Sequence, residues 1–242
     1  MRVALFSDIH GNRRGLDACL DDLTSQGGAD QIVAAGDLCL DGPRPRDVLE
    51  RLDALGARCV RGNTDRMIGD VDAGIDDQEE ADGVAWQRAQ LGETWTRWLR
   101  ELPFSLRIGT GSDALLVVHA NPKSDDEHIW PDAGDATLER LLSGVEERTI
   151  AFGHLHLPYV RMWRDRLLVD VASAGLPKDG DPRACYAIFT QRSGGWEVKH
   201  RRVAFDVDKV AREIEKSGMP RRKRHIEVLR RHRYKELGER IP

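Results

Sequence analysis

Ser7-Asp8-Ile9-His10-Gly11-Asn12 comes directly after a short apolar run at residues 3–6. Side chains two residues apart on an extended strand point to the same face. Asp8 and His10 can therefore reach one metal ion from a strand end or from the turn beyond it. Asn12 is a good N-cap for a helix that begins near residue 13. Taken alone, the stretch also fits an aspartate that only caps and a histidine that only packs.

The same arrangement, an apolar run followed by residues that can bind metal, occurs four more times along the chain. The later runs lead to Asp37, to Asn63, to His119, and to His154 with His156. Continuous apolar runs of this length are typical of strands buried on both faces. Ligands in layered α/β folds collect at the carboxyl ends of such strands. We therefore expect the five strand ends to build one shared site.

The types of side chain in this set indicate the chemistry. Carboxylates, imidazoles and an amide oxygen without thiolate suit Mn, Fe, Zn, Ni or Co. Seven ligands are too many for one four-coordinate zinc ion. They suit two divalent ions that share a bridging carboxylate, and two ions about 3.5–4 Å apart form a clamp for in-line phosphoryl displacement.

Five ordered motifs carry a family resemblance that spans residues 1 to about 190. They are Asp8-Ile9-His10-Gly11-Asn12, Gly36-Asp37, Gly62-Asn63-Thr64-Asp65, His119 and Gly153-His154-Leu155-His156. Together they resemble the calcineurin-like metallophosphoesterase superfamily. The chain looks closest to the small bacterial phosphodiesterase branch, whose closing motif is similar to residues 175–184. The fold expected is α/β (α+β), a four-layer αββα sandwich of two mixed sheets flanked by helices, with the metal site at the carboxyl ends of strands.

The resemblance also implies a ligand set and a mechanism. One ion would be held by Asp8, His10, Asp37 and His156. The other would be held by Asp37, Asn63, His119 and His154, with Asp37 as the bridge. The cofactors expected are two divalent metal ions, with manganese preferred over Fe, Zn, Ni or Co. Metal-bound hydroxide would attack phosphorus in line, at a catalytic centre that includes Asp37, Asn63 and His119.

One departure from the family pattern affects the expected substrate. The usual Gly-Asn-His-Asp/Glu appears as Gly62-Asn63-Thr64-Asp65. In the family the missing histidine protonates the leaving group or holds the phosphate, and a hydroxyl is no general acid near neutral pH. Thr64 therefore predicts a bias toward phosphodiesters, or toward esters with good leaving groups, over unactivated alkyl monoesters.

Three further residues are candidates for contact with the substrate. Arg61 lies two residues before Asn63 and could hold a phosphate, although a strand-edge arginine is the preferred interpretation. Asn12 follows the first ligand pair. His128 lies in the irregular segment after His119, a candidate specificity loop, and could replace the missing acid, although a surface histidine is preferred.

Composition limits the protein class. The chain has 242 residues, 40% of them hydrophobic and 32% charged, with a net charge of −4. That balance argues against a chain built mainly to coat nucleic acid. The first apolar run is too short for a secretory signal, and no apolar segment reaches the length of a membrane span. The four cysteines have no paired spacing, so we expect a reduced, cytoplasmic protein.

The resemblance implies a metallophosphoesterase domain over 1–205, and hydrophobic patterning predicts a helical tail over 206–242 packed on the same domain. Helices are expected at 12–25, 44–55, 84–101 and 136–144. The strands expected at 158–164, 166–170 and 184–190 are assigned to the second sheet, with 195–204 at its edge. His200 in that last strand is expected to be exposed. Residues 70–82 carry seven acids and no base, which is typical of a solvated loop, the preferred interpretation, or of a mobile lid.

The tail segment Arg221 to Lys235 holds eight basic residues and one acid. A basic helix of this kind can guide a polyanion such as nucleic acid. Its thin apolar stripe favours a helix that lies on the domain with a solvated outer face. The oligomeric state stays open, a homo-oligomer included.

The function predicted is that of a dinuclear metal-dependent phosphodiesterase that acts on small phosphodiesters or nucleotides. The alternatives within the superfamily are a dinucleoside polyphosphate hydrolase and a phosphoprotein phosphatase, and Thr64 counts against both. The alternative of another class is a metal-bound scaffold without turnover that contacts nucleic acid through its basic tail. The retention of all seven ligand residues argues against a scaffold.

Overall fold

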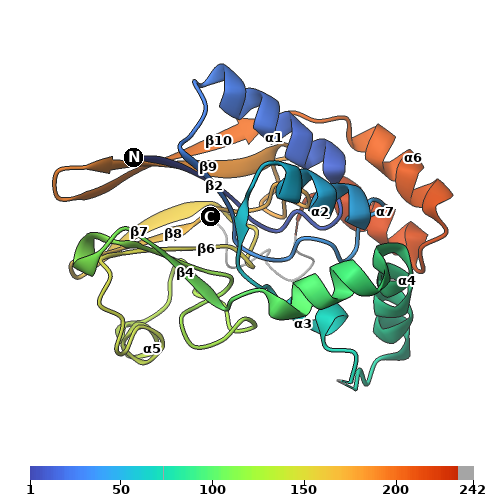
Figure 1. Ribbon diagram of the computed structural model, residues 1–242, viewed down its shortest axis with the longest axis horizontal. Helices are drawn as coiled ribbons and strands as arrows, with labels where there is room; N and C mark the ends of the chain where they lie inside the picture. The colour runs from blue at the N-terminus through green and yellow to red at the C-terminus, as the bar shows by residue number, and fades with distance from the viewer. Residues whose placement is uncertain (73, 234–242) are drawn as a thin grey trace.

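The strand β1 (Arg2–Phe6) lies at the centre of the first sheet of the computed structural model, which describes residues 1–72 and 74–233 (Figure 1). The sheet has the order β10-β9-β1-β2-β3. β1 is parallel to β2 and antiparallel to β9. The other strands of this sheet are β2 (Gln31–Ala34), β3 (Arg58–Cys59), β9 (Ala184–Arg192) and β10 (Gly195–Val203).

The second sheet is also mixed and has the order β4-β5-β6-β8-β7. Its strands β5, β6 and β8 are parallel to one another, and the two edge strands are antiparallel to their neighbours. The strands are β4 (Ser105–Ile108), β5 (Leu115–Val118), β6 (Thr149–Phe152), β7 (Tyr159–Trp163) and β8 (Arg166–Asp170).

Alternation along β1 explains why the two sheets face each other. Val3 and Leu5 point into the core between the sheets. Ala4 and Phe6 point to the opposite side, into a core formed with α1, α2 and α4. Since neighbouring side chains on a strand point to opposite faces, a strand that is apolar at every position must be covered on both sides.

The helices complete the outer layers. α1 and α2 cover the first sheet, and α5 packs on the outer face of the second sheet (Figure 1). The helices are α1 (Arg13–Ser25), α2 (Pro45–Ala54), α3 (Asn63–Gly69), α4 (Gln78–Glu101), α5 (Asp135–Leu141), α6 (Val207–Ser217) and α7 (Arg222–Arg231), with a 3₁₀ turn at Gly111–Asp113. The predicted αββα sandwich is confirmed.

The last two helices form a small cluster of their own. Val210 and Ile214 of α6 pack against Leu229 of α7, and Trp86 of α4 and Leu176 contact the same cluster. In Figure 1, α4, α6 and α7 lie at the same end of the molecule. Residues 234 and 235 of the predicted basic tail lie outside the described residues.

Three expectations about the fold are wrong. Strand β9 pairs with β1, and β10 pairs with β9, so both belong to the first sheet rather than the second. Helix α4 begins at Gln78, inside the acidic segment, because Asp77 caps it by accepting the N–H of Glu80 at 2.7 Å. His200 is not exposed: it is half-buried, with its Nε2 2.7 Å from the carbonyl of Asp170.

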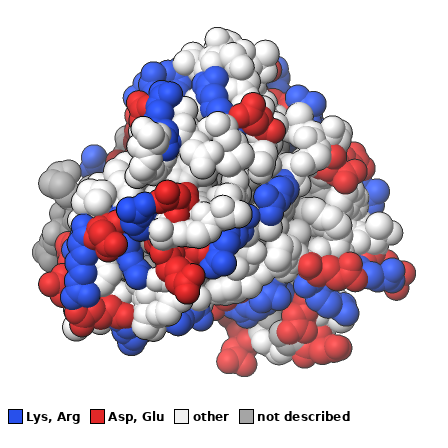
Figure 2. Space-filling model, turned by 60° about the vertical axis from the view of Figure 1, so that its left-hand side comes forward, with Lys and Arg blue, Asp and Glu red and all other residues white. Residues whose placement is uncertain are grey.

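Within the described residues, no helix combines the length and the apolar character that a membrane span requires. On the face drawn in Figure 2, basic and acidic side chains are interspersed. That face therefore lacks the continuous basic surface that contact with a nucleic-acid backbone favours.

Candidate metal centre and adjoining cleft

The turns that follow β1 and β2 are joined by backbone hydrogen bonds. The N–H of Asp8 donates to Gly36 O at 3.0 Å, and the N–H of His10 donates to Asp37 O at 3.0 Å. The parallel pairing of β1 and β2 therefore continues past the strand ends. It brings Asp8, His10 and Asp37 together although 27 residues separate the last two in sequence.

The backbone at five of the seven predicted ligands is left-handed. Their φ angles are 52° for Asp8, 47° for His10, 55° for Asp37, 67° for His154 and 58° for His156. Residues other than glycine rarely adopt this region, and such outliers cluster at functional sites where the surroundings hold them. The concentration of strained backbone at these positions supports a functional role for the turns.

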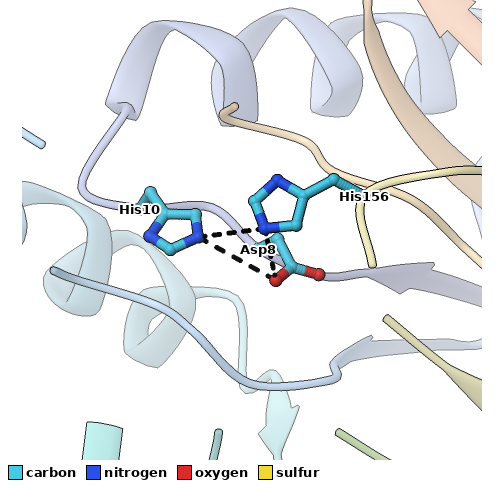
Figure 3. A group of neighbouring side chains, drawn as sticks. All are labelled: Asp8, His10 and His156. Atoms are coloured by element: carbon cyan, nitrogen blue, oxygen red, sulfur yellow. Dashed lines mark hydrogen bonds and ion pairs between the residues drawn. The ribbon is translucent and has the colours of Figure 1, made fainter. Parts of the chain in front are cut away.

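The first group of side chains is Asp8, His10 and His156 (Figure 3). Their side chains point toward one another from the turn after β1 and from the turn after β6. Asp8 Oδ1 lies 3.0 Å from His156 Nε2 and 3.9 Å from His10 Nε2. The two Nε2 atoms are 3.3 Å apart. All three residues are buried.

The second group is Asp37, His119 and His154. His119 Nε2 lies 3.3 Å from Asp37 Oδ1, 3.1 Å from His154 Nδ1 and 3.0 Å from Asn63 Oδ1. The other carboxylate oxygen of Asp37, Oδ2, lies 3.7 Å from His10 Nε2 in the first group. Asp37 is therefore placed between the two groups, with one oxygen facing each.

The hydrogen bonds of the imidazoles test whether a cation fits. Nδ1 of His10, His119 and His156 lies 2.8, 2.7 and 2.5 Å from the carbonyl oxygens of Leu40, Ala35 and Leu176. A carbonyl can only accept, so in the neutral ring the proton is on Nδ1 and the lone pair is on Nε2. The rings are thus held with their lone pairs facing the groups, as backbone carbonyls hold metal-bound histidines.

Lone pairs then face one another in both groups without a proton between them. In the first group these are His10 Nε2, His156 Nε2 and Asp8 Oδ1, and this carboxylate oxygen has no hydrogen-bond partner among the described residues. In the second group His154 Nε2 lies 2.8 Å from Asp126 O, which leaves Nδ1 as the acceptor. Because acceptors crowded in this way repel one another, each group fits a bound cation.

Protonation equilibria at His154, His156 and Asp8 agree with this arrangement. At His119, in contrast, burial is outweighed by the carboxylates of Asp37 and Asp8, which raise the pKa of that imidazole above its ordinary value. Burial lowers the pKa of His156 and of His154 to about 4, so both rings are neutral at pH 7. Burial opposes ionisation of Asp8, but the imidazoles of His156, His119 and His10 outweigh it and lower the pKa of that carboxyl. Neutral imidazoles and ionised carboxylates are the protonation states in which these groups bind metals.

Asp65 supports the centre, a role that was not predicted from its motif position in the sequence. It is buried and accepts hydrogen bonds from the N–H groups of Asp37 at 2.8 Å, Leu38 at 2.9 Å and Gly62 at 2.9 Å. These bonds tie α3 to the turn after β2. The family motif was the signal that could have identified it as a positioning residue.

The irregular segment after His119 contacts the centre from outside. The ring of His128 packs against that of His154 with centroids 4.2 Å apart, and Trp130 lies edge-on to His128 at 5.2 Å. His128 is therefore half-buried against a candidate ligand, and the interpretation as a surface histidine is wrong. It does not line the cleft described below.

A cleft of about 290 Å³ opens beside both groups. His10 of the first group and Asn63 beside the second group line it, together with Asn12 and Thr64. Asn12 caps α1, as predicted, by accepting the N–H of Gly15 at 3.0 Å, and it donates to Gly175 O at 2.7 Å. The Oγ1 of Thr64 is buried and has no hydrogen-bond partner among the described residues.

Arg61 does not line this cleft. Its Nε lies 3.9 Å from Asp125 Oδ2, and it faces a separate hollow lined by Arg66, Asp70, Asp72 and Arg100. Lys178, in contrast, does line the cleft, although no role was predicted for it from the sequence. It lies in the closing motif, which was the only signal in the sequence for it.

The relatives that match in sequence include two proteins of different kinds. The protein MJ0912 of Methanocaldococcus jannaschii is 26% identical over 236 residues, which cover 90% of this chain and 93% of that protein. The symmetrical bis(5'-nucleosyl)-tetraphosphatase of Nitrosococcus oceani is 27% identical over 170 residues, which cover 69% of this chain and 60% of that protein.

The solved structures that share the fold include the following two. The metallophosphoesterase from Sphaerobacter thermophilus has a TM-score of 0.78 at 24% identity and covers 96% of this chain and 100% of its own. The protein PH1004 from Pyrococcus horikoshii has a TM-score of 0.82 at 22% identity and covers 94% of this chain and 97% of its own. The family model of the calcineurin-like phosphoesterase superfamily domain matches residues 1–194, and the chain therefore belongs to that superfamily.

Proposed function

We propose that this chain is a metal-dependent phosphodiesterase that uses two divalent ions. The observation that carries the proposal is the cleft, whose lining includes His10 from one candidate metal group and Asn63 from beside the other. A phosphate seated there would lie next to both groups. When bound, a pair of ions supplies Lewis acidity and lowers the pKa of bound water to near neutrality.

The residues of the chain have separate tasks in this proposal. Asp8, His10 and His156 would hold one ion, and Asn63, His119 and His154 would hold the other. Asp37 sets the spacing by offering one oxygen to each group. The carbonyl partners of the imidazoles fix ring orientation, so that little reorganisation is needed when a phosphate binds.

The leaving group is where this chain differs from its family. Thr64 lines the cleft, and its hydroxyl cannot supply a proton to an alkoxide near neutral pH. We therefore expect turnover of phosphodiesters with weakly basic leaving groups and slow turnover of alkyl monoesters. Manganese is the ion we expect to support the highest rate.

A second candidate is hydrolysis of dinucleoside polyphosphates. A sequence relative from Nitrosococcus oceani is named as a symmetrical bis(5'-nucleosyl)-tetraphosphatase. A nucleotide leaves as a weakly basic phosphate, so the absence of a histidine at position 64 weighs less against this substrate than against an alkyl monoester. Basic side chains in the cleft lining also favour a polyanion.

The test compares initial rates on bis-p-nitrophenyl phosphate and on β-glycerophosphate, an alkyl monoester. The protein is first treated with EDTA and then reloaded with Mn²⁺, Zn²⁺ or Ni²⁺. We expect the aryl diester to be hydrolysed about 100-fold faster, within the range that general acid catalysis is worth. Faster turnover of the monoester, or no metal-dependent hydrolysis of either ester, would contradict the proposal.

A matched pair of variants separates the site from general damage. His119→Asn removes a candidate ligand and is expected to abolish metal-dependent turnover. His232→Asn changes a residue outside the cleft at a φ of 53°, which asparagine tolerates. Equal losses in the two variants would point to misfolding rather than to loss of a metal ligand.

A further inference from the structure

One wall of the cleft is basic and is contributed largely by a helix outside the family match. Arg221, Arg224 and His225 line the cleft from α7 and the residue before it, and the family domain ends at residue 194. Lys178 lines the cleft from the loop before β9. We call these four residues the basic wall.

The loop that carries Lys178 is held between the metal centre and the end of α7. On one side, Leu176 O accepts from Nδ1 of His156 at 2.5 Å. On the other side, the N–H of Gly180 donates to His232 O at 2.6 Å, and Asp179 forms an isolated β-bridge with Arg233. The position of Lys178 is therefore fixed relative to a candidate metal ligand and to α7 together.

The charge of Lys178 acts directly on the metal centre. Burial is the larger cause of the lowered pKa of His156, and the charge of Lys178 lowers that pKa further. The carboxylates of Asp8 and Asp37 act in return on Lys178, where burial is the largest cause of its lowered pKa. Lys178 therefore interacts electrostatically with residues of both candidate metal groups.

Acidic side chains in the cleft leave part of the basic wall available. Arg221 Nε is paired with Glu79 Oε2 at 3.1 Å, and His225 Nδ1 lies 3.7 Å from Asp41 Oδ1. Within the part of the chain that the structure describes, Arg224 has no ion-pair partner. Glu80 also lines the cleft, from α4. An anion is therefore favoured along the side formed by α7 and the Lys178 loop.

We propose that Lys178 and Arg224 bind a second phosphate group of the substrate, one that is not cleaved. This inference rests on the proposed function, since it assumes that the scissile phosphate lies at the metal centre. The substrate class would be nucleotides with a chain of phosphates, such as dinucleoside polyphosphates. Lysine and arginine are the side chains that bind phosphate through charge-assisted hydrogen bonds. A cleft of about 290 Å³ suits a small molecule rather than a duplex.

The test measures kcat/KM for diadenosine diphosphate, triphosphate and tetraphosphate with saturating Mn²⁺. We expect the wild type to gain about tenfold from the diphosphate to the tetraphosphate, the scale of one hydrogen bond between charged groups. Lys178→Gln and Arg224→Gln are each expected to flatten this gradient. Bis-p-nitrophenyl phosphate, which has no second phosphate, is measured in parallel for every variant.

Arg222→Gln is the matched control, because Arg222 is exposed on the same helix and does not line the cleft. It should keep the wild-type gradient. A wild-type gradient in either Lys178→Gln or Arg224→Gln removes that residue from the subsite. An equal loss on all substrates, bis-p-nitrophenyl phosphate included, overturns the proposal, because a general structural defect would act in that way.

A binding measurement that requires no turnover tests this inference separately from the proposed function. Tripolyphosphate is titrated calorimetrically into the metal-free full-length protein. We expect Kd to rise about tenfold in Arg224→Gln and in Lys178→Gln and to stay unchanged in Arg222→Gln. Equal affinities in all four proteins overturn the subsite even if the chain is an active phosphodiesterase. A difference in binding with no turnover of any ester keeps the subsite and rejects the proposed function.

Discussion

The carboxylate of Asp65 accepts a hydrogen bond from the backbone N–H of Asp37 at 2.8 Å. The same carboxylate accepts the N–H groups of Leu38 and Gly62, so it fixes the turn that carries the residue between the two candidate metal groups. Burial and the nearby charge of Asp37 raise the pKa of Asp65 to about 6. Asp65 is therefore ionised at pH 7 and can accept all three bonds.

Replacement of Asp65 by asparagine should weaken the site. The amide keeps one acceptor oxygen and turns an NH₂ group toward a backbone donor, which leaves a buried N–H unsatisfied at a cost of about 1–3 kcal/mol. We expect Mn²⁺ affinity to fall roughly 10–100-fold, as it does when groups that orient metal ligands are lost. Calorimetric titration with Mn²⁺ and urea unfolding measure the two effects.

Asp77→Asn is the control for that substitution. Asp77 is exposed and caps α4 through the N–H of Glu80, and asparagine is an equally good N-cap. Its free energy of unfolding and Mn²⁺ affinity should match those of the wild type. Wild-type metal affinity in Asp65→Asn would show that the three hydrogen bonds do not position Asp37.

Metal content tests the arrangement of the two groups. We expect about two Mn²⁺ ions per chain in the wild type, because the acceptors form two groups joined by Asp37. His156→Asn and His119→Asn each remove one nitrogen, from different groups, and should each reduce the content to about one ion. Mass-spectrometric metal analysis after gel filtration measures this, and a single ion in the wild type would contradict it.

Close packing of Gly175 against the turn after β1 predicts that a larger residue at this position destabilises the fold. A Cβ at this position would lie 1.8 Å from Ile9 O, a backbone atom of the turn between Asp8 and His10. Gly175→Ala should therefore lower the free energy of unfolding by about 1–3 kcal/mol, as overpacking does. Gly83→Ala lies within α4 and meets nothing within 4 Å, so it should be neutral or stabilising by up to about 1 kcal/mol. Thermal unfolding of both variants decides whether the close contact matters.

His200 predicts a pH dependence of stability. Burial lowers its pKa below the ordinary value, although the bond to Asp170 O opposes this. The unfolded state then binds more protons near pH 6, so the contribution of His200 is present above about pH 6.5 and is lost as the pH falls through that value. The wild-type free energy of unfolding minus that of His200→Gln should decrease from pH 7.5 to 5.5, by at most ~1.4 kcal/mol per pH unit. A difference that rises in that interval would contradict the sign.

Much of the fold could be predicted because local rules govern it. The apolar runs mark strands covered on both faces, and Asn12 marks the start of α1 by its capping side chain. The carboxyl ends of parallel strands meet at one edge of a sheet. The ligand-type residues that follow the runs at residues 3–6 and 32–35 were therefore expected to lie together. The strands and the helix cap depend on residues close together in sequence, and the shared edge follows from a general rule for parallel strands.

The partner of β9 could not be predicted in the same way. Its continuous apolar run from Ala184 to Phe189 fits either sheet, and its pairing with β1 joins segments more than 180 residues apart. Hydrophobic patterning reports which face of a strand is buried, but it contains no information on which strand lies beside it. The assignment of 184–190 to the second sheet failed for that reason.

The sequence by itself determined the layered fold, the family and the kinds of side chain offered at the strand ends. Only the tertiary structure decided how those side chains are held. The left-handed backbone at His10, the carbonyl of Leu40 that orients its ring, and the approach of α7 to Lys178 all depend on contacts between distant segments. Strained turns and converging lone pairs cost free energy locally, so they persist only where packing from the rest of the chain compensates.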